Sequence, residues 1–462
     1  MKNIWKKAAP AFFLVPFVLG SVGYIIEGNR VTDSLYAGFS LYFTSIVLDS
    51  YNIWIEIARW TAPLATATAI LRIFEKAGRN ILWRLQSRLG DSAAVYTDTD
   101  IRITFDNKTR VFYAGRNIKQ TAKSHIIMLD SDTASLKFYE ENKDKLRGGS
   151  VYIGLREIDY GLVKEKKEVH FFDINGAVSR LLWEHAALWR VQKEKASVVI
   201  WGGGHLAESI LSYGLLTNLY SNRQKITYHM VGNESFQIKH PQMPLMNQDE
   251  IIFHAEKDSD SWDVVRKADM VIIAESVSAA LLQAIAVNGR NARIYYYSQM
   301  AGDVGESLQL TNLIPFGRDA DIYTDENIRR EKLVEEAKRQ NLEYAEKYNG
   351  EADWNKLGGF LQWSNISSAD FGHVLAGLLK QNPELDDDIL AELEHIRWCR
   401  FHYLNYWTYG EPMDGRDKDP VWRIHKCLRP YQELSSENKR KDKTVVAKIR
   451  KRMNLTKQWG ED

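Results

Sequence analysis

The sequence predicts an α/β protein in which an N-terminal membrane helical hairpin precedes two α/β units and a small, mainly helical C-terminal domain. Two apolar stretches lie within the first 80 residues, and short β-rich runs alternate with amphipathic runs after residue 90. A glycine pattern follows one of those β-rich runs. The 462 residues have room for about three domains of ordinary size. We expect a hairpin at 1–80, α/β units at 81–194 and 195–325, a helical connector at 326–384 and a terminal domain at 385–455.

The composition excludes some classes of protein. The net charge is +1, so the chain lacks the basic excess of a nucleic-acid-binding protein, and we expect no nucleic-acid partner. Its two cysteines, Cys399 and Cys427, are too few for a disulfide framework, which indicates a reducing location for most of the chain. The mean hydropathy of -0.37 indicates that any membrane portion is a small share of the total.

Two apolar runs at the N-terminal end have the length of membrane crossings. Ala8–Ile26 contains no charged residue, and Ile53–Phe74 carries Glu56 and Arg59 near its start. Crossing a ~30 Å hydrocarbon core takes ~20 predominantly apolar residues. The alternative for the first run is a secretory signal peptide, but no small-residue cleavage site follows it.

Basic residues flank both runs. They are Lys2, Lys6 and Lys7 before the first run and Arg72, Lys76, Arg79, Arg84 and Arg88 at or after the end of the second. The positive-inside tendency then places both termini of a multi-pass protein on the cytosolic side of the inner membrane. The uncharged segment Ser34–Leu48 is short for a third crossing, so we expect it to re-enter from outside or to lie at the interface. A re-entrant segment is buried in protein or lines water, which implies a homo-oligomer around an axis.

This order of helix, re-entrant segment, helix and α/β body resembles the two-helix potassium-channel pore joined to RCK (TrkA-N) regulatory domains. The resemblance implies an ion channel that assembles as a tetramer and contacts membrane lipid. The family's filter has the form T-V-G-Y-G-D, whereas the segment 44–49 reads T-S-I-V-L-D and has no glycine, so a potassium-selective filter is not expected. Asp49 would form an acidic ring at the outer mouth of a pore, with the hydroxyls of Thr44 and Ser45 below it. The alternative for Asp49 is an interfacial residue that caps a helix.

The α/β body begins with a first, degenerate Rossmann-like unit. Its candidate strands are Ala93–Thr97, His125–Leu129, Val151–Leu155 and Val169–Phe172. An amphipathic helix follows Asn175. This unit has no glycine fingerprint, so we expect a structural or assembly role for it.

The second unit carries a stronger motif. The candidate strand 196–200 is followed by W-G-G-G-H-L-A and then by a helical run. Gly202, Gly204 and Ala207 have the G-x-G-x-x-G/A spacing in the strand–turn–helix context of a Rossmann fold. In that fold the glycines permit a tight turn, and the backbone amides at the start of the helix face a pyrophosphate. We count His205, at the start of this helix, among the candidate nucleotide-binding residues. Further candidate strands are 226–231, 270–274 and 293–297.

The ribose-binding carboxylate of such a site is expected at the end of the second strand. Asn233 occupies that position and Glu234 lies one residue later. We expect NAD or another adenine nucleotide as a regulatory ligand. The alternative is that the glycines serve helix–sheet packing alone, which the bulk of Trp201 beside the loop favours.

The C-terminal segment contains three motifs in order. They are E-H-x-x-W at 394–398, W-x-Y-G at 407–410 and P-Y-x-x-L at 430–434. Together, over 386–452, they resemble the Ryr repeat domain first known from ryanodine receptors and found also in bacterial proteins. The resemblance implies a small ligand-binding module.

Aromatic, basic and acidic side chains recur in these motifs. The candidate ligand-binding residues are Glu394, His395, Arg397, Trp398, Trp407, Tyr409 and Tyr431. A purine would stack on a ring, and a guanidinium would hold a phosphate. The alternative is that His395, Trp398 and Trp407 form the packed core of a small helical domain. No cluster with metal-ligand spacing surrounds His395, so we expect no metal site.

No catalytic motif is found, and we expect no enzyme. The sequence favours a membrane pore that a nucleotide-type ligand opens or closes from the Ryr module, the Rossmann cleft or the surface between them. A defence effector would use the same parts. One alternative is a non-conducting, membrane-anchored nucleotide sensor or oligomeric scaffold. A weaker alternative is a membrane-bound NAD-dependent oxidoreductase.

Overall fold

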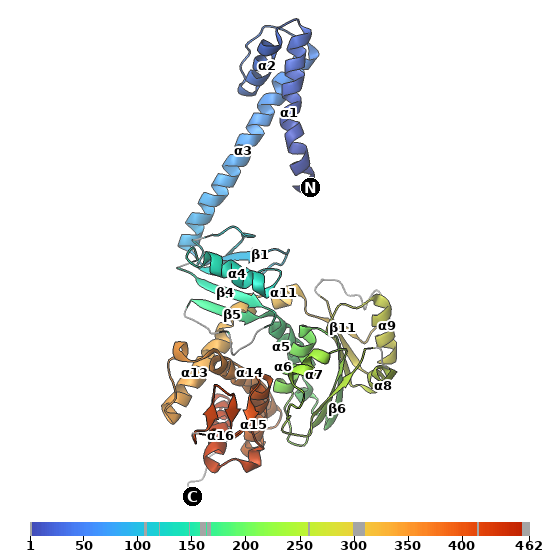
Figure 1. Cartoon of the computed structure of the whole chain (residues 1–462), viewed down its shortest axis with the longest axis vertical. Helices are drawn as coiled ribbons and strands as arrows, with labels where there is room; N and C mark the ends of the chain where they lie inside the picture. The colour runs from blue at the N-terminus through green and yellow to red at the C-terminus, as the bar shows by residue number, and fades with distance from the viewer. Residues whose placement is uncertain are drawn as a thin grey trace. The chain divides into compact units, whose positions relative to one another are not determined.

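The computed structural model describes residues 2–105, 109–119, 121–146, 148–157, 163, 168–256, 259–298, 310–413 and 415–454. The chain forms two compact units, residues 1–90 and residues 91–462. The first is a helical hairpin, and the second contains two large β-sheets, a small three-stranded sheet and the C-terminal helices (Figure 1).

The hairpin unit consists of α1 (Lys2–Ile26), α2 (Val31–Ser40), a 3-10 turn (Leu41–Phe43) and α3 (Ile53–Leu89). Its small core is formed by Tyr24, Ala37, Leu41, Ile55, Ala58 and Ala62. The side chain of Asn52 begins α3 by accepting hydrogen bonds from the backbone amides of residues 54 and 55. Its Nδ2 also donates to the Gly23 carbonyl oxygen at 2.8 Å, which fixes the start of α3 against α1.

No described helix is both long enough and apolar enough to cross a membrane. The predicted membrane hairpin with a re-entrant segment is therefore wrong, and so are the inner-membrane location with cytosolic termini and the classification as a membrane ion channel. The composition of the helices gives the physical reason: residues 61–69 of α3 are Ala, Thr and Pro apart from Leu64, and α1 includes three lysines near its start. The predicted pore residues Thr44, Ser45 and Asp49 lie exposed in the connection between the 3-10 turn and α3.

The first sheet has five parallel strands in the order β2-β1-β3-β4-β5. Its strands are β1 (Ser92–Thr97), β2 (Arg110–Tyr113), β3 (Ser124–Met128), β4 (Ser150–Leu155) and β5 (Val169–Asp173). The helices of this region are α4 (Asp132–Asn142) and α5 (Ile174–Ala186), and α5 begins where β5 ends. The four strands predicted here are all present, and β2, a partly exposed edge strand, was missed.

The second sheet has six parallel strands in the order β11-β10-β9-β6-β7-β8. Its strands are β6 (Lys195–Trp201), β7 (Lys225–Val231), β8 (Glu250–His254), β9 (Met270–Ile273), β10 (Arg293–Tyr297) and β11 (Leu313–Phe316). Its helices include α6 (His205–Thr217), α7 (Glu234–Lys239), α8 (Ser259–Lys267) and α9 (Ala279–Asn288). Numbered from β6, the strand order is 3-2-1-4-5-6, the arrangement of a Rossmann-like doubly wound sheet.

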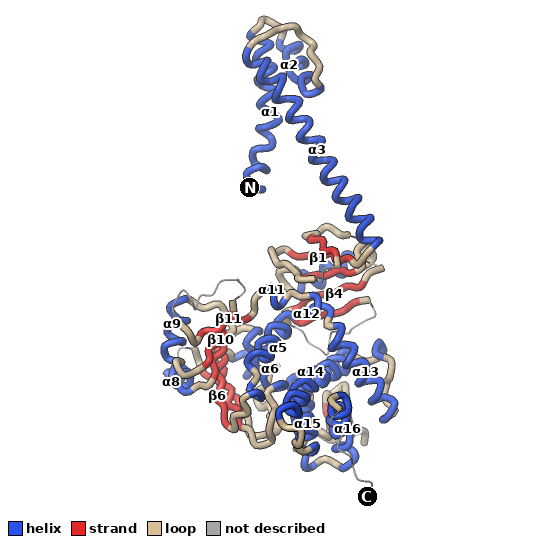
Figure 2. Tube along the Cα trace, turned by 180° about the vertical axis from the view of Figure 1, so that it is seen from behind, coloured by secondary structure: helices blue, strands red, loops and turns tan. Residues whose placement is uncertain are grey.

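The C-terminal region is helical and packs on the sheets' helices (Figure 2). It contains α11 (Asp319–Ile322), α12 (Asp325–Arg329), α13 (Glu331–Tyr348), α14 (Gly359–Gln381), α15 (Asp387–Leu404) and α16 (Ser436–Arg452), with a small sheet of β12 (Thr408–Tyr409), β13 (Lys418–Asp419) and β14 (Ile424–His425). One hydrophobic core runs from the sheets into α14, α15 and α16. The C-terminal helices are therefore part of the same unit as the sheets.

Arg400 of α15 ties this region to the second sheet. Its fully buried guanidinium donates to the carbonyl oxygens of Leu215 and Leu245 at 2.8 and 2.9 Å. It also donates to Oδ1 of Asn247 at 2.7 Å and to Oδ2 of Asp249 at 2.8 Å. These bonds fix α15 against α6 and the segment that leads into β8.

Candidate functional site

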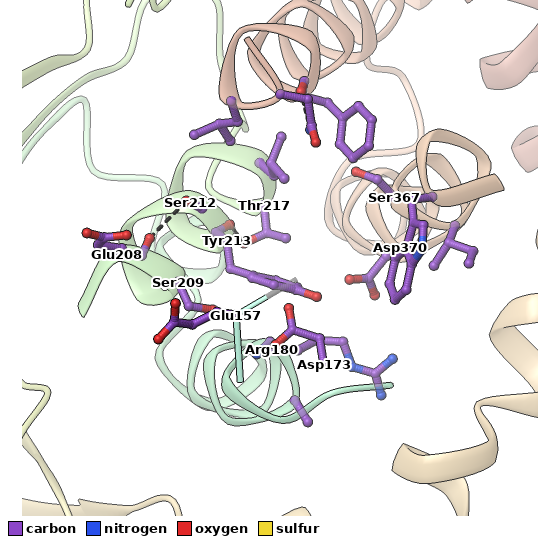
Figure 3. A pocket seen from close by; sticks show the side chains of 18 of the residues that line it. Glu157, Asp173, Arg180, Glu208, Ser209, Ser212, Tyr213, Thr217, Ser367 and Asp370 are labelled. Carbon is purple, nitrogen blue, oxygen red and sulfur yellow. Dashed lines mark hydrogen bonds between the residues drawn. The ribbon is translucent and has the colours of Figure 1, made fainter. Parts of the chain in front are cut away.

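A cavity of about 380 Å³ lies where α5, α6 and α14 converge (Figure 3). Its remaining lining comes from the residues after β4, from α7 and from α12, α13 and α15. The carboxyl ends of parallel strands face it, because Arg156 and Glu157 follow β4 and Asp173 ends β5. Ligands of open α/β sheets bind beside such strand ends. The volume lies at the lower end of the ~300–1,000 Å³ that ligand cavities have.

Asp173 and Gly176 shape the floor of the cavity. Asp173 begins α5, and its Oδ1 accepts a hydrogen bond from the backbone amide of Gly176 at 2.7 Å. A Cβ at position 176 would lie 2.5 Å from Asp173 Oδ2 and 2.9 Å from the hydroxyl oxygen of Tyr213. Only glycine therefore lets the Tyr213 hydroxyl approach the start of α5.

Tyr213 projects from α6 toward α5 in the middle of the cavity (Figure 3). Burial raises its pKa well above the ordinary range, and the nearby carboxylates of Asp173 and Asp370 raise it further. The hydroxyl is therefore protonated at neutral pH and can donate a hydrogen bond.

Asp370 of α14 and Arg180 of α5 both line the cavity (Figure 3). Burial raises the pKa of Asp370, and attraction to Arg180 partly opposes that rise. Burial disfavours the charged form of Arg180, but Asp370 and Glu184 raise its pKa above the ordinary value. Each charge thus stabilises the other within a cavity that solvent reaches only in part.

Arg330 supplies a second guanidinium. Its backbone is left-handed, with φ of 49°, at the junction of α12 and α13. The guanidinium carbon lies 4.4 Å from the centroid of the Trp363 ring, and Nη2 donates to the Phe171 carbonyl oxygen. Among the described atoms, its buried Nε has no hydrogen-bond partner. This nitrogen is a donor that a bound ligand could satisfy.

A histidine–carboxylate contact, an ion pair and a stacked ring pair lie nearer α7. His205 Nε2 lies 2.9 Å from Glu157 Oε1, and Lys239 Nζ lies 2.8 Å from Glu208 Oε2. The rings of His240 and Tyr406 stack with centroids 5.1 Å apart and an interplanar angle of 12°. Burial lowers the pKa of His240, so this ring is neutral at pH 7. Neutral stacked rings offer a flat surface for another ring.

The charges of the lining balance. The cations Arg156, Arg180, Lys239 and Arg330 are matched by the carboxylates Glu157, Asp173, Glu208 and Asp370. Between them lie five aromatic side chains: Tyr213, Phe236, Trp363, Phe401 and Tyr406. The cavity therefore suits a ligand with a planar apolar part and little net charge.

The glycine loop forms the predicted strand–turn–helix, with β6 before it and α6 beginning at His205. Gly202 has φ of 141°, a conformation that side chains rarely adopt, and Gly204 caps α6. The Glu275 carboxylate that follows β9 accepts a hydrogen bond from the Gly203 amide at 3.3 Å. A carboxylate thus occupies the place at which a Rossmann loop holds a pyrophosphate.

The predicted ribose-binding residues have other positions. Asn233 is buried, caps α7 through the Phe236 amide at 3.0 Å and faces the carbonyl oxygens of Gly202 and Gly204 at 3.4 Å. Glu234 is exposed in the first turn of α7. Ala207 is buried in the core, and His205 is the one member of the predicted nucleotide set that lines the cavity. The described loop therefore does not fit a dinucleotide held in the usual manner.

We predict that Glu275→Gln raises the affinity of the glycine loop for ADP about tenfold, or about 1.4 kcal/mol, because it removes a negative charge from the phosphate position. Isothermal titration with ADP measures the change. Glu256→Gln is the matched control, because Glu256 lies beside Gly232 rather than at the Gly203 amide. Equal affinities for the wild type and Glu275→Gln would show that this carboxylate does not block the loop.

The predicted Ryr-segment residues are mostly buried. Glu394, His395, Arg397, Trp407 and Tyr431 are buried, Trp398 is partly buried, and Tyr409 is 51% exposed. Arg397 Nε and Nη2 each donate to the Glu394 carboxylate at 2.8 Å, and its Nη1 donates to Ser367 at 3.1 Å. Ser367 lines the cavity, so this internal ion pair supports its wall.

The rings of this segment pack on one another and on Phe360 of α14. Trp398 lies 4.0 Å from His402 between centroids, and Trp407 stacks on Phe360 at 5.2 Å. Tyr409 instead lies at the surface, where its hydroxyl accepts a hydrogen bond from Arg429 at 3.0 Å. The candidate set is thus divided between the core of the C-terminal region and its surface.

Two histidines in this core have lowered pKa values and one has a raised value. Burial lowers the pKa of His425 to about 4, helped by Lys418, and burial lowers that of His402 well below the ordinary range. Burial also opposes the charge on His395, but Cys399 and the Asp442 carboxylate, 3.4 Å from Nδ1, raise its pKa well above the ordinary value.

We predict that the protein loses stability as the pH falls from about 6.5, the ordinary histidine pKa, toward 4. Over this interval the unfolded chain binds protons that the folded His402 and His425 do not, so acid favours unfolding. Urea midpoints measured from pH 7 to 4 test this. His425→Gln should flatten the dependence; an unchanged slope would place the proton uptake elsewhere. His395 acts in the opposite direction, losing its contribution as the pH rises above about 6.5.

The sequence reasoning missed the residues at the centre of the cavity: Asp173, Arg180, Tyr213, Arg330 and Asp370. Only Asp173 left a signal, as a helix-capping residue at the end of a predicted strand. The other four come from separate helices and loops, and only the packing of α5, α6 and α14 brings them together.

The described residues contain no group of three or more His, Cys, Asp or Glu side chains that could hold a metal ion. Comparisons with protein-family models and with curated proteins gave no match to this chain.

Proposed function

We propose that this protein is a small-molecule sensor that binds a nucleotide-type ligand in the cavity between α5, α6 and α14. The observation that carries the proposal is the convergence of side chains from three parts of the chain. Asp173 and Arg180 come from the first α/β unit, Tyr213 from the second, and Asp370 from the C-terminal helices. A ligand in contact with all of them would hold these parts in one arrangement.

The lining supplies the contacts that a nucleotide needs. Aromatic faces at Tyr406 and Trp363 can stack on a base. The Tyr213 hydroxyl and the Asp370 carboxylate can hydrogen-bond to ribose hydroxyls. Arg330 has a buried Nε without a partner in the described part of the chain, and it can bind a phosphate oxygen.

The charge balance narrows the choice of nucleotide. Four carboxylates offset the four cations of the lining, so a triphosphate would bring several uncompensated negative charges into a partly dry cavity. We therefore propose a nucleoside monophosphate or cyclic mononucleotide in preference to ATP. The Glu275 carboxylate accepts a hydrogen bond from the glycine loop, at the place where a dinucleotide phosphate would lie. This contact removes support from the NAD-dependent oxidoreductase alternative.

Sensing requires the ligand to distinguish two arrangements of the protein. The cavity is suited to this because its walls lie on elements that are far apart in the sequence, from Arg156 to Tyr406. A ligand that bridges α5, α6 and α14 stabilises the arrangement in which they converge. Its binding should also raise the melting temperature of the protein.

Calorimetric titration of the full chain with adenosine, AMP, cyclic AMP, ADP, ATP and NAD tests the proposal. We expect a mononucleotide to bind, and Arg330→Ala and the nearly isosteric Asp370→Asn each to weaken it at least about tenfold, or about 1.4 kcal/mol. Arg266→Ala on α8, outside the cavity lining, is the matched control. Failure of every nucleotide to bind, or equal binding by the cavity variants, would refute the proposal.

A further inference from the structure

The hairpin unit exposes an apolar stripe along α3. Its members have large exposed fractions for apolar side chains: Ile57 39%, Trp60 78%, Leu64 64%, Leu71 68%, Phe74 69% and Ile81 59%. Isolated apolar side chains at a surface are ordinary, whereas a continuous row of large ones marks an interaction surface. We call these six residues the α3 seam.

The spacing of the α3 seam is that of a heptad repeat. Starting at Ile53, which is 66% exposed, and counting alternately four and three residues gives 57, 60, 64, 67, 71, 74, 78 and 81. Every one of these positions is apolar or glycine, and the two not in the seam are Ala67 and Gly78. A repeat of 3.5 residues sustained over about four heptads is the pattern of a helix that pairs with another helix.

The seam is not the face that α3 uses within its own unit. Ile55, Ala58, Ala62 and Ala65 are fully buried, and the first three pack in the hairpin core. This inner face is made mostly of alanine, while the large apolar side chains lie on the outer face. A helix that is apolar on both faces is buried on both.

We propose that the α3 seam is a self-association surface, on which a second copy of this chain pairs its own α3 seam as a coiled coil. The heptad spacing is the observation that selects this occupant, because a second α3 carries the same repeat and matches it layer by layer. The small residues Ala67 and Gly78 meet their counterparts and let the two backbones approach closely. The charged pair Glu56–Arg59, joined at 2.7 Å, lies outside the repeat.

This surface is independent of the cavity proposed for the ligand, since the hairpin unit contributes no residue to the cavity lining. Loss of self-association and loss of nucleotide binding are therefore separate outcomes. A variant that is monomeric and still binds its nucleotide at the wild-type affinity has a folded body.

Light scattering on the full chain during size-exclusion chromatography tests the proposal. The wild type should have at least twice the monomer mass of 53.3 kDa, and the double variant Leu64→Glu, Leu71→Glu should return to 53.3 kDa. The matched control is Val15→Glu, Val22→Glu, which places two glutamates seven residues apart at exposed positions of α1. A monomeric wild type, a double variant that stays associated, or a control that dissociates equally would each overturn the proposal.

A second measurement introduces no charged residue into α3. Leu64 takes position a of the heptad repeat, and a side chain at position a meets its own counterpart in a parallel coiled coil. Leu64→Cys should therefore form a covalent dimer on oxidation. The native cysteines, Cys399 and Cys427, are both buried. Ala69→Cys, on the opposite side of α3, is the control; equal crosslinking of the two variants would overturn the pairing through the seam.

Discussion

Arg400→Ala should lower the free energy of unfolding by about 3–5 kcal/mol, the cost of breaking a buried ion pair from one side. The guanidinium is fully buried, and the substitution removes its bonds to two carbonyl oxygens, to Asn247 and to Asp249. The Asp249 carboxylate would remain buried, and its remaining partners in the described part of the chain would be the Ile226 amide at 2.7 Å and Gln224 at 3.0 Å. Urea unfolding followed by tryptophan fluorescence measures the change.

Arg266→Ala is the control for this experiment. Arg266 pairs with Asp263 at the surface, where both side chains are more than half exposed, so its loss should cost less than about 1 kcal/mol. A second check is the double substitution Arg400→Met, Asp249→Leu, which removes both charges and should recover much of the lost stability. A cost for Arg400→Ala no larger than that for Arg266→Ala would contradict the structural role of this side chain.

Glu394→Ala should cost a similar amount, about 3–5 kcal/mol, because it leaves the Arg397 guanidinium buried without its carboxylate. The side chains of this pair are 5% and 1% exposed and are joined by two hydrogen bonds of 2.8 Å. The exposed pair Lys143–Glu140 has the same i,i+3 spacing, so Lys143→Ala is the control and should have little effect. Thermal and urea unfolding provide the measurement.

The same pair separates a structural role from a ligand-binding role. If Arg397 held a phosphate, Arg397→Ala would weaken nucleotide binding and leave the stability nearly unchanged. The bidentate contact with Glu394 predicts the opposite result. Arg397→Ala should mainly lower the stability of the protein, and nucleotide binding should change only because Ser367 in the cavity wall loses its Arg397 donor. Glu394→Leu with Arg397→Met should restore stability without restoring that hydrogen bond.

Secondary-structure elements with a local sequence pattern could be predicted. The buried parallel strand β9 is a continuous apolar run, and the glycines at 202 and 204 marked the turn from β6 into α6. Of the four edge strands of the two large sheets, β5 was predicted, whereas β2 and β8, which are only partly buried, and β11, which contains Pro315, were missed. Partial burial leaves a weaker local pattern.

Local apolarity also misled the prediction at the N-terminal end. The run 53–74 has the length of a membrane crossing, yet much of its middle is alanine and threonine, and no described helix meets the requirement for a span. Length without sufficient side-chain apolarity does not specify a membrane helix. The same residues carried a second pattern, the 3.5-residue repeat, which became evident only when the exposed face of α3 was known.

Which side chains come into contact depends on how distant segments pack. The motif residues Glu394, His395 and Arg397 are buried. Arg397 pairs with Glu394, and His395 lies beside Asp442, because an unpaired charge in a core is costly. The cavity instead draws on Tyr213 and Asp370, which lie 157 positions apart in the sequence (370 − 213). The spacing of apolar residues that are close in the sequence indicates helices and strands. A site of this kind depends on the packing of α5, α6 and α14, which the spacing of neighbouring residues does not reveal.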